Sequence, residues 1–322
     1  MSAPRARVVR RPVHGVLLLD KPRGLSSNDA LQKAKWLLRA EKAGHTGTLD
    51  PLATGVLPLC FGAATKFSQL HLEADKTYEA VAVLGVKTTT GDAEGEVVSR
   101  QPAPELTADR LAQVQRQFTG ALSQVPPMHS ALKKDGKALY EYARAGEEVA
   151  REARAIMVHA LELAAARTGS GQAAVRFIAK VSKGTYIRTL GEDIGEALGC
   201  GAHLSLLRRL ATGPFDLSQC VTLEALQDMA EDERLARLLP PQALLAGHGR
   251  VTLDADNAGR FLSGLRRRGD WPDSEAVAVF GEQPPALLGT GHVKAGELIP
   301  GRLLSPIEIQ QILHPQEQAT TP

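Results

Sequence analysis

The segment from Ala43 to Gly55, AGHTGTLDPLATG, places a single carboxylate, that of Asp50, among small residues. Such a run buries little apolar surface, and its glycines lose more backbone entropy on folding than other residues do. Because Asp50 precedes Pro51, helical backbone is disfavoured at this position. A loop aspartate is most often a turn or capping residue. The histidine and glycines around Asp50 favour a second interpretation, in which the carboxylate is held out for chemistry.

Tyr78 and Arg188 are two further candidates. Tyr78, in DKTYEAVAVLG, begins a predicted strand, where a tyrosine usually packs with its hydroxyl in water. Arg188, in SKGTYIRTLGEDIG, falls in the first turn of a predicted helix, where a cation is electrostatically unfavourable. Pairing with a buried carboxylate would explain it; an exposed surface arginine is the alternative. No second carboxylate stands out near Asp50, which argues against a glycoside hydrolase with paired acids.

Length and composition indicate a globular protein. With 322 residues, of which 43% are hydrophobic and 23% charged, we expect one large domain and a small one. No apolar run has the length of a membrane span and no export signal is evident, so we expect a cytoplasmic protein. The three cysteines form no C-x-x-C pair and the nine histidines no H-x-x-x-H spacing. The sequence therefore predicts no metal site.

The basic residues are unevenly distributed, although the net charge is only +2. Each cluster alone is best interpreted as a solvated face, whereas several together permit a phosphate-binding surface. The clusters are Arg5 to Arg11, Lys133 and Lys134, Arg151 and Arg154, Arg208 and Arg209, and Arg266 to Arg268.

Apolar periodicity predicts alternating strands and helices. Strands are expected at 13–19, 55–61, 78–86, 156–163, 173–181 and 203–210, and in the C-terminal part at 276–280, 286–289 and 298–303. Helices are expected at about 28–40, 64–72, 107–118, 139–144, 185–198, 221–245 and 254–265. Ser26, Ser27 or Asn28 and Thr185 are the expected caps of the first and fifth of these.

Composition also divides the chain into parts. A basic, flexible arm is expected at 1–12, a large domain at 13–247, a small β-rich module at 248–314 and a disordered tail at 315–322. Within the large domain, residues 123–154 hold two prolines, a turn at Asp135-Gly136 and several basic residues and tyrosines. This composition suits an appendage better than a core segment.

Five ordered blocks of sequence together resemble the bacterial TruB family of tRNA pseudouridine-55 synthases. They are HGVLLLDKPRGLSSNDAL, GHTGTLDPLATGVLPLCFGAATKF, DKTYEAVAVLG, PPMHSALKKDGKALYEYARAG and SKGTYIRTLGEDIGEALGCGAHLSLLRRL. The resemblance runs from about His14 to Thr222 and is weaker in the C-terminal module. It implies an α+β pseudouridine synthase fold, with a mixed, mainly antiparallel central sheet flanked by helices and loops. It also implies a small C-terminal PUA-like RNA-binding domain and an RNA-clasping role for the insertion at 123–154.

The resemblance also implies roles for single residues. Three residues match catalytic positions of the family. Asp50 matches the essential aspartate of G-H-x-G-x-L-D-P, and Arg188 matches the arginine that pairs with it. Tyr78 matches the tyrosine that stacks on the flipped base and is implicated in removing the proton from C5. His45 matches the histidine that helps displace the target nucleotide. The substrate-binding positions with less defined roles are Lys21, Pro22, Tyr186 and Leu207.

The expected function is isomerisation of the T-loop uridine 55 of tRNA, by base flipping and Asp50-dependent cleavage and rejoining of the glycosidic bond. Nothing is oxidised and no atom is gained, so no cofactor is expected. We expect a monomer that binds the T-arm of tRNA without a guide RNA, a protein partner or a membrane. A tRNA-folding factor in which catalysis is secondary, and a guide-RNA-dependent relative, remain the alternatives. Attack on C1′, addition to uracil and proton abstraction at C2′ would all require the same carboxylate.

Overall fold

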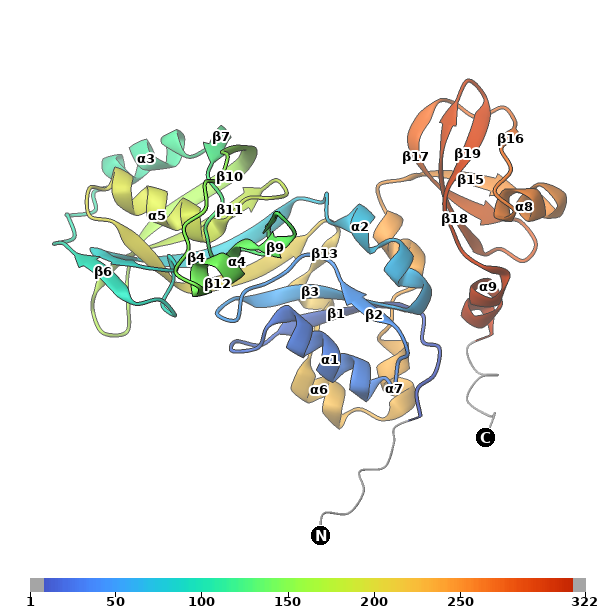
Figure 1. Cartoon of the computed structure of the whole chain (residues 1–322), viewed down its shortest axis with the longest axis horizontal. Coiled ribbons are helices and arrows are strands. Elements are labelled where there is room, and N and C mark those ends of the chain that lie inside the picture. The colour runs from blue at the N-terminus through green and yellow to red at the C-terminus, as the bar shows by residue number, and fades with distance from the viewer. Residues whose placement is uncertain (1–8, 315–322) are drawn as a thin grey trace, which may run out of the picture.

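The structure is a computed structural model that describes residues 9–314. Figure 1 shows two sheets, a large one formed by the first two thirds of the chain and a small one near the C-terminus. The expected tail at 315–322 and most of the expected arm at 1–12 lie outside the described residues. Within that arm Arg11 forms an ion pair of 2.7 Å with Glu231 and a β-bridge with Ala40. Every helix among residues 9–314 is too short or too polar to cross a membrane.

The large sheet has ten strands. Eight lie in the order β14-β1-β3-β12-β4-β11-β10-β7, with β2 beside β3 and β13 beside β12. Only β1–β14 and β3–β12 are parallel pairs, so the predicted mixed, mainly antiparallel sheet is confirmed. The strands are β1 (Gly15–Lys21), β2 (Ala43–His45), β3 (Thr54–Phe61), β4 (Lys76–Leu84), β7 (Gly120–Gln124), β10 (Arg154–Arg167), β11 (Ala173–Val181), β12 (Ala202–Thr212), β13 (Phe215–Asp216) and β14 (Val221–Thr222).

Helices cover one face of this sheet and enclose its main core, which includes Leu31, Leu190 and Leu226. They are α1 (Ser27–Leu37), α3 (Ala108–Gln117), α5 (Ile187–Ala197), α6 (Leu223–Asp228) and α7 (Glu231–Ala236). Helix α1 begins after Ser26, whose hydroxyl accepts a hydrogen bond from the N–H of Asp29 in a capping box. Thr107 caps α3, and its hydroxyl accepts from the N–H of Arg110.

Three predicted helices were wrong in detail. The segment 221–245 is not one helix. Helix α6 ends at Asp228, α7 begins after Ala230, whose backbone N–H donates to the Glu233 carboxylate at 2.9 Å, and the 3-10 helix η3 (Pro241–Leu245) follows. The segment 64–72 divides into the 3-10 helix η1 (Gly62–Lys66) and the short α2 (Ser68–His71). Thr185 does not cap α5; its hydroxyl donates to the carbonyl of Ser182, and Tyr186 holds the capping position.

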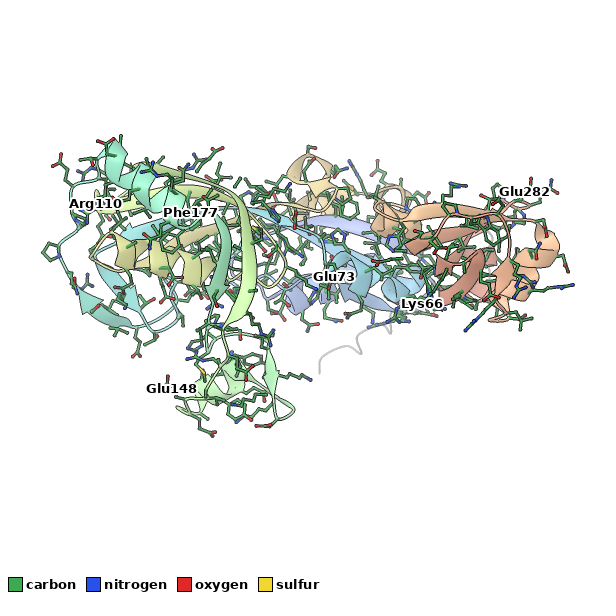
Figure 2. The ribbon with its side chains drawn as sticks, turned by 90° about the horizontal axis from the view of Figure 1, so that it is seen from above. Lys66, Glu73, Arg110, Glu148, Phe177 and Glu282 are labelled. Carbon is green, nitrogen blue, oxygen red and sulfur yellow. The ribbon has the colours of Figure 1, made fainter. Side chains whose placement is uncertain are left out.

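Residues 123–154 form a separate lobe between β7 and β10. It contains the hairpin β8 (Lys133–Lys134) and β9 (Lys137–Ala138) and the helix α4 (Leu139–Arg144). In Figure 2, Glu148 lies on this lobe, which stands out from the large sheet. A second excursion, the hairpin β5 (Val86–Thr88) and β6 (Val97–Arg100), follows β4 and includes the loop that carries Asp92.

The small sheet has the order β15-β17-β18-β19-β16. Its elements are β15 (Gly249–Leu253), α8 (Ala255–Leu262), β16 (Arg267–Arg268), β17 (Ser274–Gly281), β18 (Leu287–Lys294), β19 (Glu297–Leu303) and α9 (Pro306–Leu313). Of these, β15, β16 and α9 were not predicted. Helix α9 contacts the large domain. The Glu308 carboxylate accepts from Lys66 at 2.6 Å, and the Gln311 side-chain amide contacts His14 at 2.9 Å. A shared apolar cluster also joins the two parts.

Strand β12 fixes both ends of the loop that carries Asp50. The buried Arg209 side chain donates from Nε to the carbonyl of Val56 at 2.7 Å and from Nη2 to that of Gly47 at 3.2 Å. Its neighbour Arg208 forms two bonds to the Asp20 carboxylate and a third to the Thr54 hydroxyl. These arginines are therefore not a solvated cluster, as the sequence alone suggested, but anchors for the loop.

Two glycines of this loop, Gly55 and Gly44, differ in whether a larger side chain would fit. Gly55 has φ +103°, and a Cβ there would lie 2.2 Å from the carbonyl oxygen of Arg209. Only glycine lets the two backbones pair at this distance. At Gly44 a Cβ would meet no atom within 4 Å, so this position is open to solvent or to a ligand.

We predict that Gly55→Ala destabilises the protein by about 2–4 kcal/mol, because it combines a strained φ with a backbone overlap. Gly44→Ala is the matched control and should change the free energy of unfolding by less than about 0.5 kcal/mol. Urea unfolding of both variants measures the difference. Equal stability of the two variants would show that β12 does not fix the loop in this way.

Candidate active site

A cavity of 760 Å³ opens over the middle of the large sheet. Five of the residues predicted from the sequence line it together, although they come from four separate segments: Asp50, Tyr78, Tyr186, Arg188 and Leu207. The wall opposite the sheet is built by the 123–154 lobe, through residues that include His129 and Tyr140.

Asp50 and Arg188 form an ion pair in this cavity, with 2.9 Å between the carboxylate Oδ2 and Nε. The Arg188 side chain is only 6% exposed, whereas that of Asp50 is 37% exposed and so open to a ligand. The other guanidinium nitrogens donate to the carbonyls of Thr90 at 3.0 Å and His129 at 2.6 Å. The arginine is thus held from three sides, and it holds the carboxylate in one orientation.

Asp92 was missed by the sequence reasoning, which found no second carboxylate near Asp50. This buried residue lies with one oxygen 3.7 Å from Nη1 of Arg188. Its other oxygen accepts from the Thr90 hydroxyl at 2.6 Å and from the N–H of Glu94 at 3.0 Å. A polar loop with an Asx turn is common in proteins, so nothing in the sequence distinguished Asp92 from a surface turn residue.

The surroundings of Asp50 shift its pKa in opposite directions. Burial raises the pKa of the Asp50 carboxyl, and Asp92 raises it further, whereas Arg188 and Lys21 lower it. Lys21 is completely buried and does not line the cavity. Its ammonium donates to the carbonyls of Pro22 at 2.9 Å and Leu25 at 2.6 Å, and burial lowers its pKa to about 8. Lys21 therefore acts on Asp50 through its charge and fixes the turn at 22–25.

Two neighbouring strands supply the floor of the cavity. In the register of β4 and β12, Tyr78 lies opposite Arg209, and Leu207 lies opposite Ala80. Because side chains alternate along a strand, Tyr78 and Leu207 project from the same face of the sheet. Tyr186 is fixed at the start of α5 by Gln124, whose side-chain amide bonds both its N–H and its carbonyl. The rings of Tyr78 and Tyr186 and the side chain of Leu207 thus form a surface that suits a flat, partly apolar ligand.

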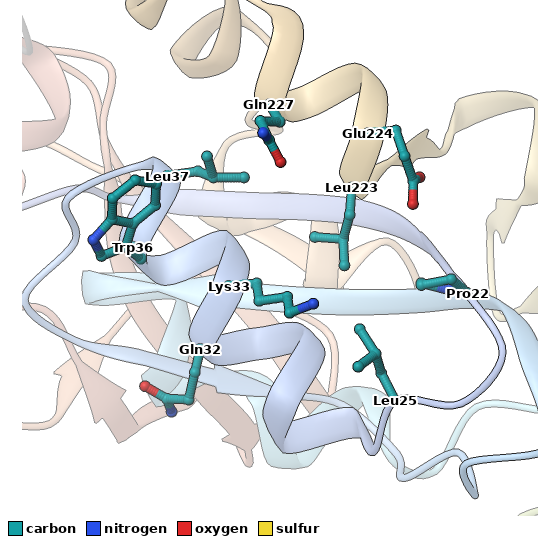
Figure 3. Close-up of a pocket in the computed structure, with 9 residues that line it drawn as sticks. All are labelled: Pro22, Leu25, Gln32, Lys33, Trp36, Leu37, Leu223, Glu224 and Gln227. Atoms are coloured by element: carbon teal, nitrogen blue, oxygen red, sulfur yellow. The ribbon is translucent and has the colours of Figure 1, made fainter.

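His45 and Pro22 are not brought into this cavity. His45 is half-buried on β2, and burial, together with the charge of Arg209, lowers its pKa. Pro22 lines a separate cleft of 470 Å³ between α1 and α6. Figure 3 shows this cleft, with Pro22 at one end and Trp36 at the other.

The arrangement supports chemistry by one carboxylate. An anion held by a buried arginine, above an aromatic and aliphatic floor, is suited to stabilise positive charge that develops on a bound ligand. Among the described residues, no group of three His, Cys, Asp or Glu side chains is placed to hold a metal ion.

Comparisons with known proteins agree on one family. Residues 35–187 match the model of the TruB family pseudouridylate synthase N-terminal domain, and residues 188–245 match that of the tRNA pseudouridylate synthase B C-terminal domain. The tRNA pseudouridine synthase B of Verminephrobacter eiseniae is 67% identical over 98% of this chain and 96% of its own length. That of Ralstonia nicotianae is 56% identical over 93% of this chain and 97% of its own length.

Solved structures show the same fold. A Cbf5-Nop10-Gar1 complex contains a chain with 27% identity and a TM-score of 0.69, covering 92% of this chain and 86% of that one. An H/ACA RNP bound to a substrate RNA containing 2′-deoxyuridine contains one with 25% identity and a TM-score of 0.68.

The charge balance at Asp50 leads to two shifts of opposite sign. Arg188→Lys removes the Nε contact and should raise the pKa of Asp50, because its carboxylate loses a hydrogen bond from a cation. Asp92→Asn removes a neighbouring negative charge and should lower that pKa. Carbon-13 NMR titration of the carboxyl groups, assigned with Asp50→Asn, measures both. A pKa that moves in the same direction in the two variants would contradict the account.

Proposed function

This chain belongs to the TruB family of pseudouridylate synthases, and we propose that it converts uridine 55 in the T-loop of tRNA to pseudouridine with Asp50 as the catalytic carboxylate. It is an isomerase that modifies tRNA. The observation that supports the role of Asp50 is its ion pair with the buried Arg188 in the cavity over β4 and β12.

The reaction breaks the bond between C1′ and N1 of uridine and joins C1′ to C5. No atoms are gained or lost, so residues of the chain suffice for it. Cleavage of a glycosidic bond develops positive charge on the sugar, which a carboxylate on one face can stabilise. Arg188 keeps Asp50 ionised against the effect of burial. Attack on C1′, addition to uracil and proton abstraction at C2′ all require this ionised form.

Tyr78, Leu207 and Tyr186 are the residues that we assign to the extruded base. A uridine in a folded T-loop is stacked, and its extrusion costs a few kcal/mol. Stacking on an aromatic ring offsets about 1–3 kcal/mol of this cost per base. We assign His45 and Pro22 to contacts with RNA outside the cavity, and Lys21 to support of Asp50 and the 22–25 turn.

The remaining parts of the chain would bind the rest of the tRNA. The 123–154 lobe forms one wall of the cavity and carries exposed lysines at 133 and 134, so we assign it to closure over the T-arm. The 248–314 module is assigned to sequence-independent RNA contacts through its arginines. We propose that the enzyme works in the cytoplasm as a monomer, without a guide RNA or partner protein.

The test is release of tritium from a tRNA transcript made with C5-tritiated uridine, using the purified chain and no other protein, RNA or cofactor. We expect about one tritium released per tRNA, and none from a transcript with cytidine at position 55. Chemical mapping of the product should place pseudouridine at position 55. Tight binding without release would favour the tRNA-folding role, and release from the cytidine-55 transcript would show a different target.

A further inference from the structure

One end of the cavity is lined by two buried cations that the proposed chemistry does not use. Lys76 is 9% exposed and Arg209 is 1% exposed, yet both line the cavity. Tyr78 lies two residues after Lys76 on β4 and directly opposite Arg209 on β12. The strand register therefore places both cations beside the tyrosine, on the face of the sheet that holds the substrate base in the proposed function.

Neither cation has an ion-pair partner among the described residues. Among residues 9–314, no carboxylate oxygen lies within 4.0 Å of the Lys76 ammonium or the Arg209 guanidinium, and both donate to neutral backbone carbonyls. Lys76 bonds those of Leu72 and Ala74. Arg209 uses Nε and Nη2, while its Nη1 has no acceptor among the described residues. Burying unpaired cations is costly, and an anionic ligand would offset that cost.

The space in front of this guanidinium is kept open by a glycine. A Cβ at Gly47, whose φ is +78°, would lie 3.4 Å from Nη1 of Arg209. Gly47 itself lines the cavity. Because Gly47 has no side chain, the Nη1 atom of Arg209 is left accessible from this side of the cavity.

The electrostatics of Lys76 agree with this geometry. The pKa of Lys76 is lowered to about 8, chiefly by burial and also by the charges of Arg209 and Lys183, which Asp75 and Glu73 partly offset. The nearby His71 ring is neutral near pH 7, because burial lowers its pKa to about 4. An anion bound here would be the main partner for both cations.

We propose that Lys76 and Arg209 form a phosphate subsite, which binds a backbone phosphate adjacent to the nucleotide whose base lies against Tyr78 and Leu207. This inference rests on the proposed function, since it requires an RNA nucleotide in the cavity. It adds a fixed point on the backbone beside the target base. Holding the phosphate on one side and the base on the other would set the ribose over Asp50.

The test is a double-mutant cycle between Lys76 and single phosphates of the RNA. The tRNAs carry one neutral methylphosphonate, either 5′ or 3′ of the target uridine. Binding is measured in the Asp50→Asn background, so that the RNA stays unconverted. The variants are Lys76→Met, Lys76→Arg, which keeps the charge, and the control Lys180→Met, an exposed lysine on β11 that projects from the opposite face of the sheet.

We expect Lys76→Met to raise the Kd for unmodified tRNA about tenfold and to reduce the slope of log Kd against log salt by about 0.7–0.9. For the protein with Lys76, one of the two methylphosphonates should also raise the Kd about tenfold. For Lys76→Met, the same methylphosphonate should raise the Kd by less than about twofold. Lys180→Met should show neither effect, and Lys76→Arg should restore most of the affinity.

The proposal is overturned if Lys76→Met and both methylphosphonates act independently, with effects that multiply. If thermal unfolding shows that Lys76→Met does not fold, the Lys76→Arg variant is used instead. An affinity and a sensitivity to methylphosphonate close to those of the protein with Lys76 would support the subsite. A Kd that neither methylphosphonate changes would overturn it. These binding measurements do not depend on turnover. Tritium release by the unsubstituted protein tests the proposed function separately.

Discussion

The site depends on the burial of the Arg188 guanidinium. A cation with a side chain 6% exposed must be satisfied by nearby acceptors, and this requirement brings together segments that are far apart in the sequence. The carboxylate of Asp50, the carbonyl of Thr90 and the carbonyl of His129 all converge on it. The position of Asp50 is therefore coupled to the hairpin loop after β5 and to the 123–154 lobe. A displacement of either segment would change the electrostatic field at the Asp50 carboxylate.

Three other buried cations hold backbone around the site. Lys21 and Lys76 donate to carbonyls of the turns beside them, and Arg209 donates to the carbonyls of Gly47 in the Asp50 loop and Val56 on β3. An ammonium or guanidinium can satisfy several carbonyls at once, so a loop poor in apolar side chains can still be rigid. The charge of Lys21 also lowers the pKa of Asp50, against the effects of burial and of Asp92. The same cations thus serve both the fold and the electrostatics.

Local rules predicted the chemical residues better than their surroundings. An arginine in the first turn of α5 is unfavourable without a partner, which suggested either pairing with a carboxylate or an exposed side chain; in the structure Arg188 is buried and paired with Asp50. The sequence around Asp92 contains no such conflict, because an aspartate is an ordinary residue in a polar loop. The separation of Pro22 and His45 from the cavity depends on how β1, β2 and α1 pack, which periodicity does not specify. The break between α6 and α7 depends on the extended backbone at Met229 and Ala230 and on the bond from the Ala230 N–H to the Glu233 carboxylate, which helix propensity does not specify.

The most direct measurement is the single-turnover rate of pseudouridine formation by Asp50→Asn, together with its affinity for tRNA. Asparagine keeps the size of the side chain but removes the charge that Arg188 holds in place. The account predicts a rate at least about 10³-fold below that of the unsubstituted protein, with the Kd for tRNA changed by less than about threefold. A folded Asp50→Asn protein that forms pseudouridine at a rate close to the unsubstituted one would contradict the central role of this carboxylate.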